Sequence, residues 1–129
     1  MIILDARVLI AHLDAQDAHH ARADELLAAT SPEPLGASVI TLAEVLVAPA
    51  RSRRLGRATA ALQQLGVAGV ALGVDSPLRL AVLRAETNLK MPDCCVLLAA
   101  ETADASIATF DERLAAAAVA RGYVVAGRP

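Results

Sequence analysis

The sequence predicts an α/β fold, a three-layer α/β/α domain with a mostly parallel central sheet. Short apolar segments typical of buried strands alternate with longer segments of helical spacing, an order that favours right-handed crossovers between parallel strands. Hydrophobic residues make up 56% of the 129 residues, which excludes intrinsic disorder and provides for a generous core. No linker, repeat or low-complexity tract interrupts the chain, so we expect one domain over residues 1–129.

The first half of the chain contains two predicted strands and four predicted helices. The strands cover residues 1–4 and 35–39, and the helices cover 8–13, 17–30, 41–48 and 53–65. Pro49 is expected to lie just past the third helix, because proline cannot donate a backbone hydrogen bond inside one. Thr41 and Glu44 have the spacing of a capping box, and Gly66 is expected to end the fourth helix.

The second half contains three predicted strands and three predicted helices. The strands lie within residues 67–74, 106–109 and 123–126, and the helices begin at Asp75-Ser76-Pro77, at Pro92 and at Asp111. Residues 94–100 are apolar on nearly every side, so their helix should be central. The preceding helix is expected to turn one face inward, formed by Leu78, Ala81, Val82, Ala85 and Leu89.

Composition and charge exclude several classes of protein. The longest apolar runs are far shorter than the roughly 20 residues of a membrane-spanning helix, and the first residues lack the basic region of a signal peptide. Adjacent Cys94 and Cys95 form a poor disulfide pair, so we expect a cytoplasmic protein. A net charge of −2 gives no general attraction to nucleic acid, and Phe110 and Tyr123 are too few for a base-stacking platform.

Four acidic residues follow predicted strands or lie in the first turns of predicted helices: Asp5, Glu44, Asp93 and Asp111. Each except Asp5 has an ordinary explanation as a helix cap or a first-turn acid. Ligands of open α/β sheets bind beyond the carboxyl ends of the strands, where these four side chains could meet. Carboxylates gathered in one cleft repel each other unless a cation is bound, and oxygen ligands favour Mg²⁺ or Mn²⁺. Such an ion supports phosphodiester hydrolysis without a protein nucleophile.

Four segments, in order along the chain, resemble the acidic motifs of the PIN-domain nucleases, and among these the VapC-type toxins of bacterial toxin–antitoxin pairs. They are Met1-Ile2-Ile3-Leu4-Asp5-Ala6, Thr41-Leu42-Ala43-Glu44-Val45-Leu46, Met91-Pro92-Asp93-Cys94 and Ala108-Thr109-Phe110-Asp111-Glu112-Arg113-Leu114. The resemblance implies a PIN-like fold and a Mg²⁺-dependent endoribonuclease, with Mn²⁺ as a substitute, that cuts structured RNA of the tRNA or rRNA type. It also implies a homodimer silenced by a cognate VapB-type antitoxin, with Asp5, Glu44, Asp93 and Asp111 as catalytic metal ligands.

The sequence departs from the PIN-domain pattern at Arg7, where a small hydroxyl or amide residue is usual two places after the first acid. Arg7 can grip a substrate phosphate, point into solvent, or enter the acidic cluster and compete with the metal. The last alternative predicts a catalytically weak binding module that occupies antitoxin or RNA without cutting. Thr109, two places before Asp111, can hydrogen-bond a metal-bound water or simply end a strand.

Further residues are candidates for contacts with partners. Four arginines without a nearby acid suit RNA phosphates, although a solvated helix face has the same pattern: Arg51, Arg53, Arg54 and Arg57. His12, His19 and His20 lack the partners of a zinc site and are better read as surface residues. The aliphatic early helices, around Leu9, Ile10, Leu13, Leu26 and Leu27, pack a core or form a groove for a partner helix.

Overall fold

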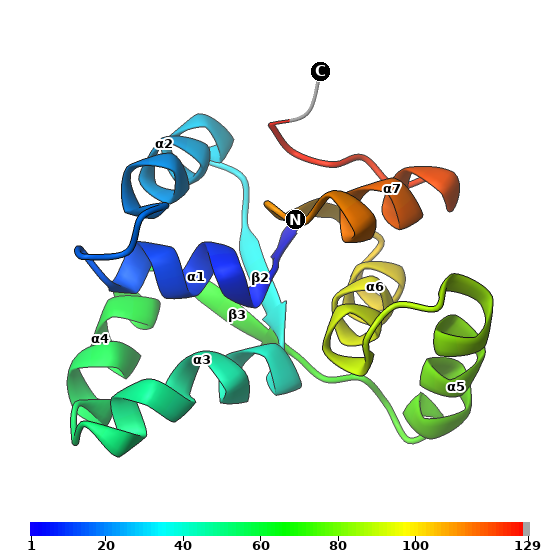
Figure 1. Cartoon of the computed structure of the whole chain (residues 1–129), viewed down its shortest axis with the longest axis horizontal. Helices are drawn as coiled ribbons and strands as arrows, with labels where there is room; N and C mark the ends of the chain where they lie inside the picture. Colours follow the sequence, from blue (N-terminus) through cyan, green and yellow to red (C-terminus); the bar gives the residue numbers. More distant parts are fainter. Residues whose placement is uncertain (128–129) are drawn as a thin grey trace.

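Four parallel strands form the centre of the fold in the computed structural model, which describes residues 1–127 (Figure 1). The strands are β1 (Ile2–Leu4), β2 (Leu35–Ser38), β3 (Val67–Val70) and β4 (Ser106–Ala108), in the order β3-β2-β1-β4. Ile3 of the interior strand β1 is in register with Gly36 on one side and Ile107 on the other. The parallel sheet confirms the predicted α/β class.

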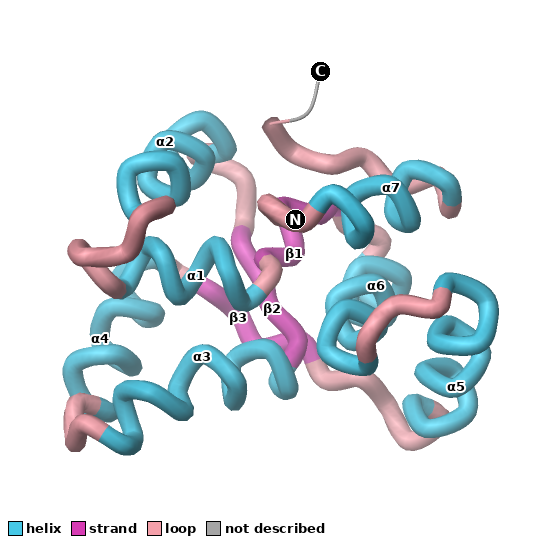
Figure 2. Tube along the Cα trace, in the orientation of Figure 1, coloured by secondary structure: helices cyan, strands magenta, loops and turns pink. Residues whose placement is uncertain are grey.

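Seven helices surround this sheet among the described residues, and Figure 2 shows them on both sides of the strands. They are α1 (Ala6–Leu13), α2 (His20–Thr30), α3 (Val39–Arg51), α4 (Leu55–Leu65), α5 (Ser76–Thr87), α6 (Met91–Ala103) and α7 (Glu112–Ala120). Each connection between neighbouring parallel strands contains at least one helix, as a crossover in a parallel sheet requires.

The alternation of side chains along β1 divides the core into two halves. Ile3 points to the half built with α5, α6 and α7, whereas Ile2 and Leu4 point to the half built with α1 to α4. Helix α6 is the central element of the first half, because every residue from Cys94 to Ala100 is buried. The predicted three layers and the predicted central helix are both confirmed.

Helix α3 differs from the prediction at both ends. It begins at Val39, and its N-cap is Ser38, whose hydroxyl accepts a hydrogen bond from the Thr41 N–H. The predicted capping box at Thr41 and Glu44 is therefore wrong. The helix also continues through Pro49 to Arg51. A proline is tolerated there because the helix ends within one turn, where the Ser52 and Arg54 N–H groups bond the carbonyls of Ala48 and Pro49.

The inward face of α5 is also different from the prediction. Leu78 is 75% exposed and Val82 is 52% exposed, while Leu83 is buried and Leu80 packs against the core. Ala81 and Ala85 are exposed as well, and only Leu89, beyond the helix, is buried as predicted. The face that α5 turns inward is set by the buried residues that flank the helix, Leu72 and Leu89. The helical spacing alone does not reveal this orientation.

The predicted last strand is reduced to a single bridge between Val125 and Ile107. The last two residues of the predicted domain, 128 and 129, lie outside the described residues. Within residues 1–127 no helix has the length and apolarity needed to cross a membrane.

Candidate functional site

Asp5 stands at the end of the interior strand β1 and is almost completely buried. Its backbone N–H continues the sheet by donating to the Ala108 carbonyl, and its Oδ2 accepts a hydrogen bond of 2.7 Å from the Thr109 hydroxyl. It is formally the N-cap of α1, but its side chain makes no capping hydrogen bond. The Asp5 carboxylate therefore does not cap α1, as the sequence suggested.

Thr109 joins two of the four acidic segments. Its hydroxyl donates to Asp5 and accepts a hydrogen bond of 3.0 Å from the Asp111 N–H. Asp111 caps α7, because its Oδ1 accepts hydrogen bonds from the backbone N–H groups of Arg113 and Leu114. The Asp111 cap was predicted, whereas the bond between Thr109 and Asp5 was not among the roles considered for Thr109.

Glu44 and Asp93 approach the same edge from two helices. Glu44 is an exposed residue in the second turn of α3, and Asp93 is a partly buried residue in the first turn of α6. The parallel sheet brings these helices together, since β2 leads into α3 at the edge where β1 leads into Asp5. Helices α3 and α6 also contact each other directly.

Electrostatic interactions between the four carboxyl groups show how close they lie. Burial raises the pKa of Asp93 to about 6, with further contributions from the negative charges of Asp5, Asp111 and Glu44. Burial also raises the pKa of Asp5, against the hydrogen bond from Thr109, and the pKa of Glu44, which is raised further by the Asp5 charge. The structure therefore brings all four predicted acids into one repelling cluster.

The donor set of this cluster fits a hard divalent cation. Its side chains offer only oxygen ligands, and a bound cation would offset the repulsion that, together with burial, raises the pKa values of Asp5, Glu44 and Asp93. Among the described residues no three Asp, Glu, His or Cys side chains stand ready to hold one ion together. Mg²⁺ commonly binds through one or two carboxylates and keeps several waters, so the arrangement suits Mg²⁺ better than a metal held by a complete protein cage.

The sequence of residues 2–120 matches the family model described as PIN domain. The chain belongs to the PIN-domain family. This confirms the predicted resemblance, and the match includes all four acidic residues of the cluster.

Solved structures resemble this PIN domain over nearly its whole length. A toxin–antitoxin complex from Klebsiella pneumoniae is 25% identical and has a TM-score of 0.73, with 86% of this chain and 87% of that chain covered. The sarcin–ricin-loop-cleaving toxin VapC20 of Mycobacterium tuberculosis is 21% identical, with a TM-score of 0.74 and coverage of 96% and 97%. FitAcB from Neisseria gonorrhoeae is 20% identical, with a TM-score of 0.71 and coverage of 98% and 97%. No curated protein matches the sequence significantly.

Arg7 lies beside the acidic cluster of this PIN domain without entering it. Its charge lowers the pKa of Asp5, but it is the weakest of the influences on that carboxyl. Arg7 is exposed, and within residues 1–127 its guanidinium pairs with no carboxylate. Lys90 is the other cation whose charge reaches the cluster, where it acts on Asp93.

The four predicted RNA-contacting arginines surround the junction of α3 and α4. All are exposed, and none forms an ion pair within the described part of the chain: Arg51, Arg53, Arg54 and Arg57. Arg54 and Arg57 line a groove of about 630 Å³ between α1, α3 and α4, whereas Arg51 and Arg53 do not. Glu44 lines the same groove, so it runs up to the acidic cluster.

A second cavity adjoins the cluster on the opposite side, between α2, α7 and residues 125–127. Its lining includes Thr109, Phe110, Arg22 and Glu25. From the sequence, Phe110 was expected only as a member of the fourth acidic segment and as one of too few aromatic residues for a base-stacking platform, and no role was predicted for Arg22 or Glu25. Nothing in the local pattern of α2 indicates that it docks beside Phe110, because that contact depends on the packing of distant segments.

Proposed function

We propose that this PIN domain is a metal-dependent endoribonuclease toxin that hydrolyses phosphodiester bonds in structured RNA of the tRNA or rRNA type. The observation that carries the proposal is the convergence of Asp5, Glu44, Asp93 and Asp111: burial, together with the negative charges of the other three acids, raises the pKa of Asp93 to about 6. Family membership supports the nuclease class. The fold shared with the sarcin–ricin-loop-cleaving toxin supports RNA as the substrate.

In this proposal the four carboxylates hold Mg²⁺, or Mn²⁺ as a substitute, directly or through water. When bound, such an ion would lower the pKa of a bound water to give a hydroxide and would stabilise negative charge on the phosphodiester. Thr109 holds the Asp5 carboxylate in place through its hydrogen bond to Oδ2. At least one of the four carboxylates accepts a hydrogen bond from the attacking water and so orients it toward phosphorus.

The nuclease is tested by cleavage of total bacterial RNA with Mg²⁺, with Mn²⁺ and with EDTA. Wild-type protein is expected to give discrete fragments only with a divalent ion. The Asp5→Asn, Asp93→Asn double variant is expected to give none, while Asp75→Asn, an exposed acid outside the cluster, cuts like wild type. Folded, antitoxin-free protein that cuts nothing with either metal contradicts the proposal.

Arg7 motivates a second candidate function, a catalytically weak module that binds antitoxin or RNA without cutting. Its charge acts on Asp5, which is the position from which it can compete with a metal ion. If Arg7 is inhibitory, Arg7→Ser raises metal affinity and cleavage, whereas Arg113→Ser, at an exposed arginine of α7, changes neither. Unchanged cleavage by Arg7→Ser contradicts the inhibitory role.

The four arginines at the junction of α3 and α4 are proposed to contact RNA phosphates. The salt dependence of RNA affinity reports the number of such contacts, and removing two of them reduces the slope of log K against log[salt] by about 1.5 to 2. Arg51→Gln, Arg53→Gln is the informative pair, because these residues lie outside the groove between α1, α3 and α4. An unchanged slope contradicts the RNA contact for that pair.

A VapB-type antitoxin is the proposed protein partner, and the groove between α1, α3 and α4 is its proposed site. Ile10, Leu13 and Val45 give the groove an apolar wall, and Arg54 and Arg57 give it positive charge. An amphipathic antitoxin segment with acidic residues would complement both features and would end beside Glu44. Ile10→Asp is expected to weaken the complex at least tenfold in calorimetry while RNA cleavage by the free toxin persists.

We also propose a homodimer in the cytoplasm. Apolar side chains exposed on α5, among them Leu78 and Val82, would be covered by a second copy of the chain. Light scattering after size exclusion tests the dimer, and Leu78→Lys, Val82→Lys is expected to shift it to monomer. The two cysteines are free and buried, in keeping with a reducing compartment.

A further inference from the structure

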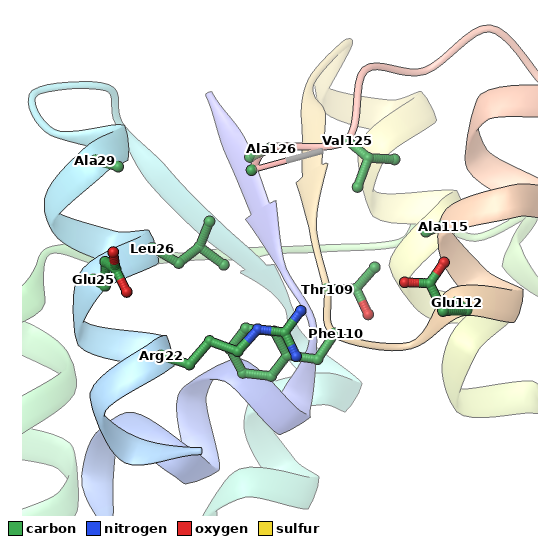
Figure 3. Close-up of a pocket in the computed structure, with 11 residues that line it drawn as sticks. Arg22, Glu25, Leu26, Ala29, Thr109, Phe110, Glu112, Ala115, Val125 and Ala126 are labelled. Carbon is green, nitrogen blue, oxygen red and sulfur yellow. The ribbon is translucent and has the colours of Figure 1, made fainter. Parts of the chain in front are cut away.

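The cavity between α2, α7 and residues 125–127 has the size and lining of a small-molecule site. Its volume is about 490 Å³, within the usual range for ligand pockets. Leu26, Ala29, Val125 and Ala126 give it apolar walls, and Figure 3 shows Leu26 and Val125 on opposite sides of it. Polar side chains stand at its edge, which is the usual design of a site that holds a flat, partly apolar ligand.

The inner end of the cavity is a layered surface made by an aromatic ring and a guanidinium. The Arg22 guanidinium carbon lies 4.4 Å from the centroid of the Phe110 ring, and Figure 3 shows the two side chains overlapping. The His19 ring adds a third group, with its centroid 5.8 Å from that of Phe110. Aromatic rings and arginine guanidinium planes are the groups on which proteins stack unpaired RNA bases.

Two charged groups at this cavity have no ion-pair or hydrogen-bond partner in the described chain. Within residues 1–127 neither Arg22 nor Glu25 forms an ion pair or a side-chain hydrogen bond, although both belong to α2. A free carboxylate only accepts hydrogen bonds, and a free guanidinium only donates them. Guanine matches Glu25, since its N1–H and N2–H₂ groups both donate hydrogen bonds on one edge of the base.

The cavity adjoins the acidic cluster through consecutive residues. Thr109 and Phe110 line it, and Thr109 donates its hydroxyl hydrogen to Asp5. Asp111 follows Phe110 directly and belongs to the cluster that raises the pKa of Asp93. A nucleotide whose base entered the cavity would therefore have its phosphate beside the carboxylates.

We propose that this cavity is a guanine-binding subsite, which accepts the unstacked base of a guanine nucleotide next to the phosphodiester bond that is cut. Phe110 and Arg22 stack the base, and Glu25 accepts hydrogen bonds from its N1–H and N2–H₂ groups. The inference deepens the proposed nuclease function by naming a base preference, and it rests on that function for the meaning of the adjacent phosphate.

The decisive experiment is an NMR titration of the full-length protein, without metal and with EDTA, using GMP, AMP, CMP and UMP as probes. GMP is expected to shift the amide signals of residues lining the cavity and to bind about tenfold more tightly than the other three. Glu25→Gln is expected to remove most of this preference, and Glu33→Gln, an exposed glutamate outside the cavity, to retain it. No shifts at the cavity with any nucleotide, or equal affinity for all four, overturns the inference.

A second pair of variants separates stacking from a change in packing. Phe110→Tyr keeps an aromatic ring and is expected to bind GMP like wild type, whereas Phe110→Leu keeps only apolar volume and is expected to lose about tenfold in affinity. Equal binding by both variants overturns the stacking role. If Phe110→Leu weakens the antitoxin complex but leaves GMP binding unchanged, the cavity serves the protein partner and the inference is wrong.

The titration and the cleavage assay test the two proposals independently. If the protein binds GMP in the cavity but cuts no RNA, the subsite proposal stands and the nuclease proposal is wrong. If the protein cuts RNA but binds no nucleotide in the cavity, the nuclease proposal stands and the subsite proposal is wrong. Sequencing of the cut ends adds a direct check, since guanine beside the cut should be frequent for wild type and much less frequent for Glu25→Gln.

Discussion

Thr109 shows at the scale of one residue how a buried charge is held in place. Its hydroxyl is the donor to Asp5 and the acceptor for the Asp111 N–H, so one side chain fixes two acidic segments that are far apart in the chain. A buried carboxylate without a donor is costly, because it loses its hydration without gaining a hydrogen bond. Asp5 is nearly buried, so the stability of the fold depends on this bond.

Replacing Thr109 by valine should therefore destabilise the protein. Valine has nearly the shape of threonine but no hydroxyl, and we expect a loss of about 1–2 kcal/mol in the free energy of unfolding measured with urea. Thr109→Ser keeps the hydroxyl and should lose less. Equal losses for the two variants would mean that the methyl group matters more than the hydrogen bond.

Asp93 should make the metal-free protein more stable in mild acid. Its pKa is about 6 in the folded chain, above the ordinary value of 3.8, so the folded state binds the proton more tightly than the unfolded state. Stability should rise as the pH falls from 7 toward 4, where Asp93 is protonated in the folded state and about half protonated in the unfolded state. Because water screens part of the repulsion at this partly buried group, we expect a gain of about 1 kcal/mol, less than the full pKa difference implies.

The check is a series of urea unfolding curves in EDTA between pH 7 and pH 4. Asp93→Asn should be more stable than wild type at pH 7 and should gain less on acidification. Some gain should persist, since the pKa values of Asp5 and Glu44 are also raised. The exposed acid Asp75, replaced by asparagine, serves as control. A wild-type protein whose stability falls steadily from pH 7 to pH 5 contradicts this assignment.

Sequence reasoning located the four acids but not the residues around them. Asp5 and Asp111 could be placed because acids that follow parallel strands gather at one sheet edge. The hydrogen bond from Thr109 to Asp5 could not be predicted from the sequence, because it joins the ends of two strands whose pairing is known only from the fold. The same holds for Arg22 over Phe110, which depends on where α2 packs.

At the scale of elements, α3 carries Glu44 and begins with a buried cap. Ser38 accepts from the Thr41 N–H, and the hydroxyls of Ser38 and Thr41 also hydrogen-bond each other at 2.9 Å. Ser38 is the last residue of β2, so one residue ends a strand and starts a helix. The direction in which α3 leaves the sheet, and with it the place of Glu44, follows from this cap.

Ser38→Ala should cost about 1 kcal/mol or slightly more in the free energy of unfolding, because the Thr41 N–H loses its partner. Ser52→Ala is the matched control: its exposed hydroxyl bonds only carbonyls of the helix end, so we expect a change within about 0.5 kcal/mol. Circular dichroism during thermal unfolding gives both values. Losses of equal size would show that the cap does not hold α3.

The elements themselves were predictable to different degrees. The apolar run before Asp5 indicated a buried strand, and the all-apolar segment 94–100 indicated a buried helix. Both predictions are confirmed. The predicted start of α3 and the predicted inward face of α5 were wrong. Several polar residues near Thr41 can cap a helix, and two different faces of α5 carry leucine. Packing against the rest of the chain decides such choices.

At the scale of the whole molecule, a charged network joins the helices on one side of the sheet. Arg121, just after α7, bonds Glu86 of α5 at 2.9 Å and Glu101 of α6 at 3.0 Å, and Arg79 of α5 bonds Glu101 at 3.2 Å. The hydrogen bonds to Glu86 and Glu101 raise the pKa of Arg121. The network connects the residue that follows α7 to α6, the helix that carries Asp93 in its first turn.

Arg121→Gln should lower the free energy of unfolding by about 1 kcal/mol at low salt, because the network loses the cation that its two glutamates share. In about 1 M NaCl the difference from wild type should shrink, since salt screens partly exposed charges. Arg113→Gln is the control, an arginine of α7 without an ion pair in the described chain. A salt-independent difference would assign the loss to packing of the arginine stem.

The fold class was the most predictable property of the molecule, because it follows from the order of strand-like and helix-like segments and does not need their exact bounds. The two cavities were the least predictable. They lie between helices whose relative positions no local pattern encodes.

The interior position of β1 has a consequence for the order in which the protein is made. Strand β1 is made before the other three strands and must wait for β4 before its second edge is paired, and the bond from Thr109 to Asp5 spans 104 positions. The acidic cluster can be complete only after Asp111 has been synthesised. A nascent chain that ends before β4 therefore carries no assembled site, and a truncated variant that lacks β4 is expected to show no metal-dependent cleavage in the RNA assay described above.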